Sequence, residues 1–137
     1  MQCAPLLGFD GTCREAMTWY ADLFGSPAPT VMTYGDAPTG GGMGEMDPSK
    51  VMYADVRIGD GLLMGADTMM SHHAAAEGIS VMVDPADGAE GRRIFDALAE
   101  GGEVTMPFER TFWSSGFGMV RDRFGIPWIV SSQPEGD

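Results

Sequence analysis

Two stretches of the sequence, 53–67 (YADVRIGDGLLMGAD) and 117–131 (FGMVRDRFGIPWIVS), have almost the same plan. Each is typical of two apolar strands joined by a short turn that contains a glycine. When Tyr53 is set against Phe117, further residues match at equal spacing: Val56 with Val120, Arg57 with Arg121, and Gly61 with Gly125. The match predicts one supersecondary unit that the chain uses twice.

Each hairpin follows a helical pattern that ends at glycine. In the first half, apolar residues recur on one helical face between Thr12 and Gly25, and the spacing of Thr12 and Glu15 predicts a capping box at the helix start. In the second half, Asp87 and Glu90 have the same spacing before an apolar stripe that ends at a pair of glycines. We therefore expect one helix in each half.

Short apolar runs predict the remaining strands, at 3–9, 27–34, 79–83 and 103–107. The run at 27–34 is expected at a sheet edge, because its prolines lack the N–H group that a central strand donates. The predicted fold class is α+β, a single domain over 1–137 with two tandem βαβββ modules. Module one spans about 1–67, a connector spans 68–77, and module two spans about 78–133. A helix covers only one face of such a curved mixed sheet, so we expect the uncovered faces to line a shared cup.

The charge of the chain limits its partners. The formal net charge is -12, from 20 acidic residues against 8 Lys and Arg residues. Binding to nucleic acid or to an anionic membrane needs clustered cations, so neither partner is expected. No basic region precedes a long apolar run at the start, so no signal peptide is expected. Cys3 and Cys13 do not form a disulfide framework, and we expect reduced thiols in a cytoplasmic protein.

Two segments invite a ligand-binding interpretation that their residues do not support. The loop at 35–49 holds three consecutive glycines, but it has neither the spacing nor the basic residue of a phosphate-binding loop, and we expect a mobile flap. His72 and His73 are adjacent in the connector, so their side chains point in different directions and make a poor metal-binding pair. We expect both to be surface histidines.

Four stretches carry a resemblance to a known family: FDGTCREAMTWYADLFG, VMYADVRIGDGLLMGAD, RRIFDALAEGGEVTMP and TFWSSGFGMVRDRFGIPWIVSS. The chain resembles the vicinal-oxygen-chelate superfamily, which includes glyoxalase I, bleomycin-resistance proteins and extradiol dioxygenases. More narrowly, it resembles the PhnB-like branch, which is often labelled demethylubiquinone-methyltransferase-like. The resemblance implies a glyoxalase-like fold and a homodimer. The sequence has no glycine-rich strand-to-helix loop for S-adenosylmethionine, so methyl transfer is not expected.

The resemblance also implies where a metal ion would bind. In the superfamily's enzymes, His and Glu side chains from the first and last strands of the modules hold a divalent metal that polarises a substrate with two neighbouring oxygens. The corresponding positions here are Pro5, Gly65, Gly78 and Ile129, and none of these side chains binds metals. Two residues along the same strand faces lie Leu7, Asp67, Ser80 and Ser131, of which only Asp67 is a good ligand. We therefore expect neither a divalent metal nor another cofactor.

The candidate ligand pocket comprises equivalent strand positions of the two hairpins and nearby aromatic residues: Tyr53, Asp55, Arg57, Trp113, Phe117, Met119 and Trp128. Asp55 and Arg57 either orient a ligand or pair with each other on an exposed face, and the aromatic residues either line the pocket or fill the core. We predict a metal-independent homodimer that binds a small molecule, partly apolar or cationic. The alternative is a metal-dependent enzyme of glyoxalase or dioxygenase type, with an atypical site completed by Asp67 or by a dimer partner. No catalytic residue is assigned.

Overall fold

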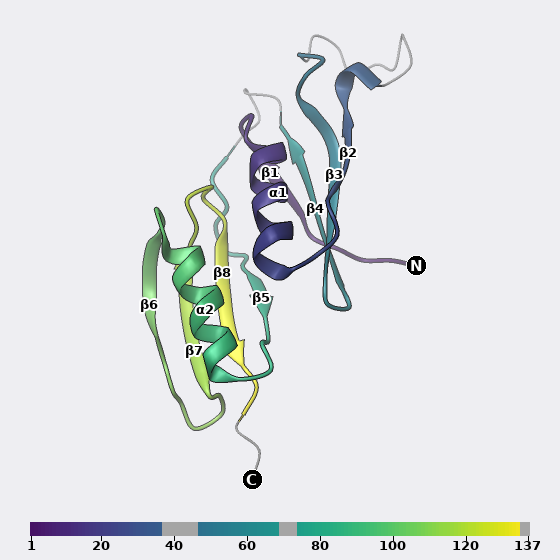
Figure 1. Cartoon of the computed structure of the whole chain (residues 1–137). Coiled ribbons are helices and arrows are strands. Elements are labelled where there is room, and N and C mark those ends of the chain that lie inside the picture. Colours follow the sequence, from purple (N-terminus) through teal and green to yellow (C-terminus); the bar gives the residue numbers. More distant parts are fainter. Residues whose placement is uncertain (37–46, 69–73, 135–137) are drawn as a thin grey trace. The chain divides into compact units, whose positions relative to one another are not determined.

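The computed structural model describes residues 1–36, 47–68 and 74–134 (Figure 1). The chain divides into two compact units, Met1–Ala74 and Ala75–Asp137, at a point inside the expected connector. Within these described ranges each unit contains one α-helix and four strands in the order βαβββ, which confirms the predicted α+β fold. Among the helices of the described ranges, none has the length and apolar character that crossing a bilayer requires.

The first unit builds a four-stranded sheet with one helix. Its elements are β1 (Leu6–Phe9), α1 (Cys13–Phe24), β2 (Thr30–Thr33), the 3-10 turn η1 (Tyr34–Asp36), β3 (Val51–Ile58) and β4 (Gly61–Asp67). The strand order is β1-β4-β3-β2, with β1 parallel to β4 and the other pairs antiparallel. Strand β2 lies at the edge of the sheet, as the prolines before it predict.

The second unit repeats this topology. Its elements are β5 (Val81–Val83), α2 (Gly88–Ala99), β6 (Glu103–Glu109), β7 (Gly116–Arg121) and β8 (Pro127–Ser132). The strand order is β5-β8-β7-β6, and again the first strand runs parallel to the last while the other pairs are antiparallel. In both units the first and last strands are therefore neighbours.

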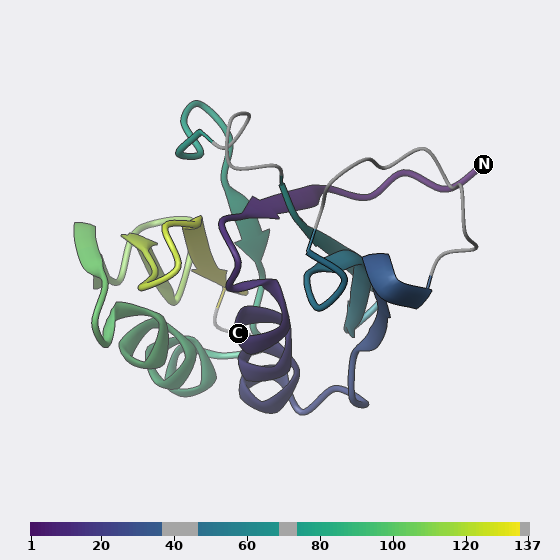
Figure 2. The same cartoon turned by 90° about the horizontal axis from the view of Figure 1, so that it is seen from above.

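Each helix covers one face of its own sheet (Figure 2). The apolar side of α1, with Cys13, Met17 and Tyr20 buried, packs on β3 and β4. The packing is close, since a Cβ atom on Gly65 would lie 3.0 Å from the Met17 sulfur. The apolar stripe of α2 packs on β7 and β8 in the same way. We call the face of each sheet that is turned away from its own helix the open face.

The start of α1 is held by a residue that local sequence patterns do not reveal. The predicted capping box is wrong, because the Thr12 side chain makes no capping hydrogen bond. Instead the buried carboxylate of Asp67, at the end of β4, accepts hydrogen bonds from the backbone N–H groups of Cys13 (3.0 Å) and Val51 (2.9 Å). Burial, with a smaller contribution from the Asp67 charge, raises the pKa of the Cys13 thiol to about 12. Asp67 of β4 thus connects the start of α1 with the start of β3 through hydrogen bonds.

The capping box of α2 is confirmed. The Asp87 carboxylate accepts a hydrogen bond from the Glu90 N–H group at 2.8 Å. The Glu90 carboxylate reaches back to the backbone, where it accepts from the Ala86 N–H group at 3.4 Å. Beyond the helix end, Gly101 has a φ of 74°, a left-handed conformation that glycine adopts without strain.

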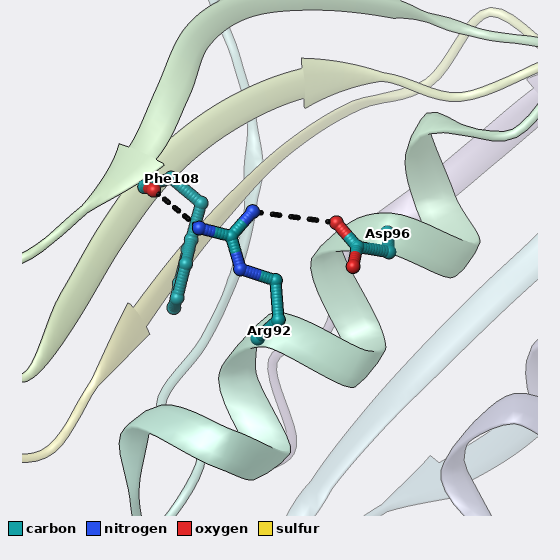
Figure 3. Close-up of polar contacts among 3 residues, drawn as sticks. All are labelled: Arg92, Asp96 and Phe108. Atoms are coloured by element: carbon teal, nitrogen blue, oxygen red, sulfur yellow. Dashed lines mark hydrogen bonds and ion pairs between the residues drawn. The ribbon is translucent and has the colours of Figure 1, made fainter.

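Helix α2 is also fastened to the edge strand β6 through Arg92 (Figure 3). The Arg92 guanidinium donates a hydrogen bond to the Phe108 carbonyl oxygen at 2.8 Å, and its carbon lies 4.9 Å from the centre of the Phe108 ring. The same guanidinium forms an exposed ion pair with Asp96, at 3.4 Å. The buried Phe108 ring packs in turn on Phe95 of α2, with ring centres 5.4 Å apart.

The turn between β7 and β8 is organised by the buried carboxylate of Asp122. One oxygen accepts hydrogen bonds from the N–H groups of Phe124 (2.9 Å) and Ile126 (3.0 Å). The other accepts from the indole N–H of Trp128 at 2.8 Å. These three bonds join the turn to the core beneath it.

This second turn is one residue longer than the first. In the first hairpin Arg57 pairs with Leu62, five positions later. In the second, Arg121 pairs with Pro127, six positions later. The repeat equivalent of Ile129 is therefore Met64, and the expected equivalence with Gly65 is wrong by one position.

A bulge interrupts the regular alternation of side chains along β3. Met32 pairs with Tyr53 and Thr33 pairs with Val51, which leaves Met52 as an extra residue. Val51 is consequently buried on the same side as Ala54 and Val56, although its position in the sequence has the opposite parity.

Candidate functional site

A row of side chains crosses the open face of the first sheet. Strand register places Leu6 beside Met64, Met64 beside Asp55, and Asp55 beside Thr30. These residues lie on the side opposite the buried Ala54, because successive side chains along a strand point to opposite faces. Leu6 is 53% exposed. A carboxylate thus lies in the middle of the row, directly beside a methionine.

The Asp55 carboxylate is held by a neighbour on the same strand. The Tyr53 hydroxyl donates a hydrogen bond to Asp55 Oδ2 at 2.6 Å, and both side chains are half-buried. This hydrogen bond is the main cause of the raised pKa of Tyr53, since it stabilises the protonated phenol. Within the described part of the chain, Asp55 and Arg57 form no ion pair with each other, and Arg57 is exposed. The partner of Asp55 is Tyr53, not Arg57.

The equivalent row on the second sheet is entirely apolar. Strand register places Met82 beside Ile129, Ile129 beside Met119, and Met119 beside Met106. Met82 is 60% exposed and Met106 is 44% exposed. Thioether side chains are flexible and polarisable, so a row of three methionines adapts to apolar ligands of different shapes.

Aromatic side chains extend this apolar surface toward the β6–β7 connection. Phe117 lies on β7 two residues before Met119, so both point to the open face. The Trp113 ring meets Phe117 edge to face with centres 5.5 Å apart, and Phe112 meets Trp113 in the same manner at 4.7 Å. Phe112 is 97% exposed. The group offers stacking surfaces next to the methionine row.

The aromatic segment is anchored by a buried serine. Ser114 Oγ lies 2.7 Å from the Gly116 carbonyl oxygen and 2.6 Å from that of Ser132, and it accepts a hydrogen bond from the Gly116 N–H group. The Thr111 N–H group donates to the Ser114 carbonyl oxygen at 3.1 Å. Trp113 is therefore attached to a fixed stretch of backbone.

Trp128 lies on the other side of the second sheet from the expected pocket residues Phe117 and Met119. It pairs with Val120, its side chain is buried, and its indole N–H is used by Asp122. Trp128 is consequently a core residue and does not contribute to the open face.

The remaining expected pocket residues fall into two groups. Tyr53, Asp55 and Arg57 share the open face of the first sheet, and Phe117 and Met119 share that of the second, with Trp113 beside Phe117. The other members of the two rows were not expected in the pocket: Leu6, Thr30, Met64, Met82 and Met106, with Ile129 considered only as a metal position. Their alternation within strands was visible, but only the pairing of strands shows that they meet in rows.

The described side chains at the expected metal positions do not suit a divalent metal ion. Asp67, the single good ligand among the expected positions, directs both carboxylate oxygens to backbone N–H groups. Over the described ranges 1–36, 47–68 and 74–134, His, Cys, Asp and Glu side chains form no group of three that could hold an ion. The predictions for His72 and His73, and for most of the glycine-rich loop at 35–49, concern residues outside the described ones.

Comparisons with known proteins give the chain its relatives. A model of the family described as 3-demethylubiquinone-9 3-methyltransferase matches residues 1–131. Protein YjdN of Escherichia coli (strain K12) is 32% identical over 140 residues, which cover 96% of this chain and 95% of that protein. The crystal structure of protein PA1353 from Pseudomonas aeruginosa is similar, with 36% identity, a TM-score of 0.87, and coverage of 98% and 99% of the two chains.

A more distant structure shares the fold. A glyoxalase/bleomycin resistance protein from Albidiferax ferrireducens T118 is 13% identical to this chain, with a TM-score of 0.65. The similarity covers 98% of this chain and 99% of that one. At this identity the likeness concerns the glyoxalase-like fold alone.

Proposed function

The chain belongs to the family described as 3-demethylubiquinone-9 3-methyltransferase, the PhnB-like branch of the vicinal-oxygen-chelate superfamily, and we propose that it binds a small molecule without a metal ion. The ligand is partly apolar, and the protein acts as a homodimer. Each open face offers candidate contact residues within its own unit: Tyr53 and Asp55 on the first sheet, and Phe117 and Met119 on the second.

The observation that carries this proposal is the apolar row on the open face of the second sheet. Met82, Met106 and Met119 leave thioether surface on a sheet face that its own helix does not cover. Exposed apolar surface of this kind is costly in water and typically marks a binding site. The adjoining Trp113 and Phe117 rings supply flat surfaces suited to an aromatic ligand.

The hydrogen bonds of Asp67 favour a small-molecule-binding protein over the metal-dependent enzyme alternative. Its carboxylate satisfies two backbone donors, one of them at the start of α1, so coordination of a metal would leave buried N–H groups without acceptors. The open-face row of the second sheet offers only Ile129 and thioethers where the superfamily's enzymes place hard ligands, and a divalent ion such as Mg²⁺ or Zn²⁺ binds these weakly.

Ligand binding is tested with a panel of aromatic and aliphatic small molecules, by native mass spectrometry and by the shift in melting temperature. Met119→Glu places a charge in the apolar row, and we expect it to abolish binding. Val104→Glu is the matched control, because Val104 is exposed on the same sheet but pairs with Val120 of the opposite face. If the two variants bind equally well, the open face is not the site.

Metal independence is tested by elemental analysis of protein purified without a chelator. We expect no stoichiometric divalent metal and no change in melting temperature when zinc, iron, manganese or nickel is added. A stoichiometric metal in the purified protein would overturn this part of the proposal and restore the enzyme alternative.

Self-association is tested by sedimentation velocity at micromolar concentration. We expect a dimer, because the large exposed apolar side chains of the open faces gain most from being covered. A monomer at these concentrations would contradict the proposal that the protein acts as a homodimer.

A further inference from the structure

We propose that the Tyr53–Asp55 pair recognises a protonated amino group of the ligand, while an apolar part of the same ligand lies on Leu6 and Met64. The inference rests on the proposed small-molecule binding and deepens it by naming a charged group that the open face of the first sheet would recognise. The apolar row of the second sheet has no side chain that could bind such a group.

The first step concerns the unused acceptor capacity of Asp55. The Tyr53 hydroxyl occupies Oδ2, while Oδ1 accepts no hydrogen bond from any residue that the structure describes. The carboxylate is half-buried, and its neighbour in the row is the apolar Met64. A partly desolvated carboxylate interacts strongly with a cation that brings its own N–H donors.

The second step concerns what Tyr53 adds. Its hydroxyl fixes the position of the carboxylate through the bond at 2.6 Å, so a cation meets an oriented acceptor. The phenol also brings an aromatic ring next to the carboxylate, and ammonium groups are attracted to the faces of such rings. Charge and ring together resemble the usual chemistry of amine recognition.

The third step compares the two sheets. Asp55 pairs with Met64, and the equivalent pair in the second sheet is Met119 with Ile129. The same position of the same topology thus carries a methionine in one unit and an aspartate in the other. Since the fold accepts an apolar residue there, the carboxylate is not required to build the sheet, and a role in recognition explains its presence.

The surrounding charges favour a cationic ligand. The formal net charge of -12 attracts cations from a distance. Arg57 lies on the same open face but is exposed and forms no ion pair with Asp55 within the described residues, so it does not neutralise the carboxylate. The net negative charge of the protein and the Asp55 carboxylate therefore both favour a cationic ligand.

The experiment compares two probes of nearly equal shape, phenethylammonium and the neutral 2-phenylethanol, by isothermal titration calorimetry and by chemical-shift changes of β3 amides. We expect the native protein to bind the cation at least tenfold more tightly, because a hydrogen bond to a charged group contributes more than a neutral one. Asp55→Asn should remove this preference, because the amide carries no charge that attracts the cation over the alcohol. Tyr53→Phe should reduce the preference several-fold, because the carboxylate remains but loses its fixed position.

Asp22→Asn is the matched control. It removes the same charge from an exposed position on α1, away from the open face, and should leave the preference for the cation intact. Equal affinity of the native protein for the two probes would overturn the amine inference while leaving small-molecule binding in place. A preference that survives in Asp55→Asn would also overturn it, by assigning the cation to another group. Failure of both probes to bind would overturn the inference together with the proposed function.

Discussion

Replacing Asp122 by alanine is expected to destabilise the protein more than any other single change of an acidic residue in the second unit. The carboxylate accepts three hydrogen bonds, at 2.8, 2.9 and 3.0 Å, and two of the three donors belong to the buried residues Ile126 and Trp128. Alanine offers no side-chain acceptor, so all three of these hydrogen bonds are lost.

The magnitude follows from the number and burial of these donors. A buried donor left without an acceptor costs about 1–3 kcal/mol. Two such donors and one half-buried donor give a loss of about 3–5 kcal/mol in the free energy of unfolding, a large share of the ~5–15 kcal/mol that holds a typical domain together. Asp122→Asn keeps one acceptor oxygen but turns an amide group toward a donor, so we expect an intermediate loss of about 2 kcal/mol.

The assay is urea unfolding followed by far-ultraviolet circular dichroism, with Asp96→Ala as the control. Asp96 lies on α2 of the same unit, its side chain is 62% exposed, and its ion pair with Arg92 is worth little in water. We expect the control to cost under ~0.5 kcal/mol. Hydrogen exchange should also quicken at the Ile126 amide in Asp122→Ala. If Asp122→Ala proves no more costly than Asp96→Ala, the three bonds do not hold the turn and the reasoning fails.

Three further predictions concern the helices. Gly91→Ala should lower the melting temperature, although alanine has the better helix propensity. A Cβ atom at this position would overlap Ser132 Oγ in the buried contact between α2 and β8. A higher melting temperature would contradict this packing. Labelling with a thiol reagent at pH 8 should modify the exposed Cys3 and spare the buried Cys13. The free energy of unfolding should fall between pH 9 and 12, because the Cys13 thiol has a pKa near 9.0 in the unfolded chain and near 12 in the folded one. Two equally reactive thiols in the native protein would refute this prediction. Arg92→Ala should lower the free energy of unfolding in urea by about 1–2 kcal/mol, because it removes the hydrogen bond and the ring contact with Phe108 on β6. A loss equal to that of Asp96→Ala would show that these contacts contribute nothing.

The fold was predictable because its strongest signals are local. Alternation in strands, glycines after helices and the repeated hairpin all act over a few residues, and the edge position of β2 followed from its prolines. The capping box at Asp87 was read correctly for the same reason. At Thr12 the same local pattern misled, because Asp67, 54 positions from Cys13, supplies the acceptor instead.

The candidate site was less predictable because it depends on register. One extra residue in the Asp122 turn moved the repeat equivalent of Ile129 from Gly65 to Met64. Trp128 was expected in the pocket. The face on which a strand residue lies depends on its register, and here Trp128 is buried in the core with its indole N–H bonded to Asp122. Tyr53 and Asp55 were both expected in the pocket, but the hydrogen bond between their side chains could be found only in three dimensions.

The pairing of the first strand with the last has a consequence for the order in which the protein forms during synthesis. Leu6 pairs with Met64, 58 positions later, so β1 leaves the ribosome long before β4, its one neighbour among the described strands, exists. Helix α1 packs on β3 and β4, so its apolar side stays in water until these strands emerge. Closing so long a loop is entropically costly and slow. We expect the nascent first unit to remain unfolded, and dependent on chaperones, until its last strand is complete.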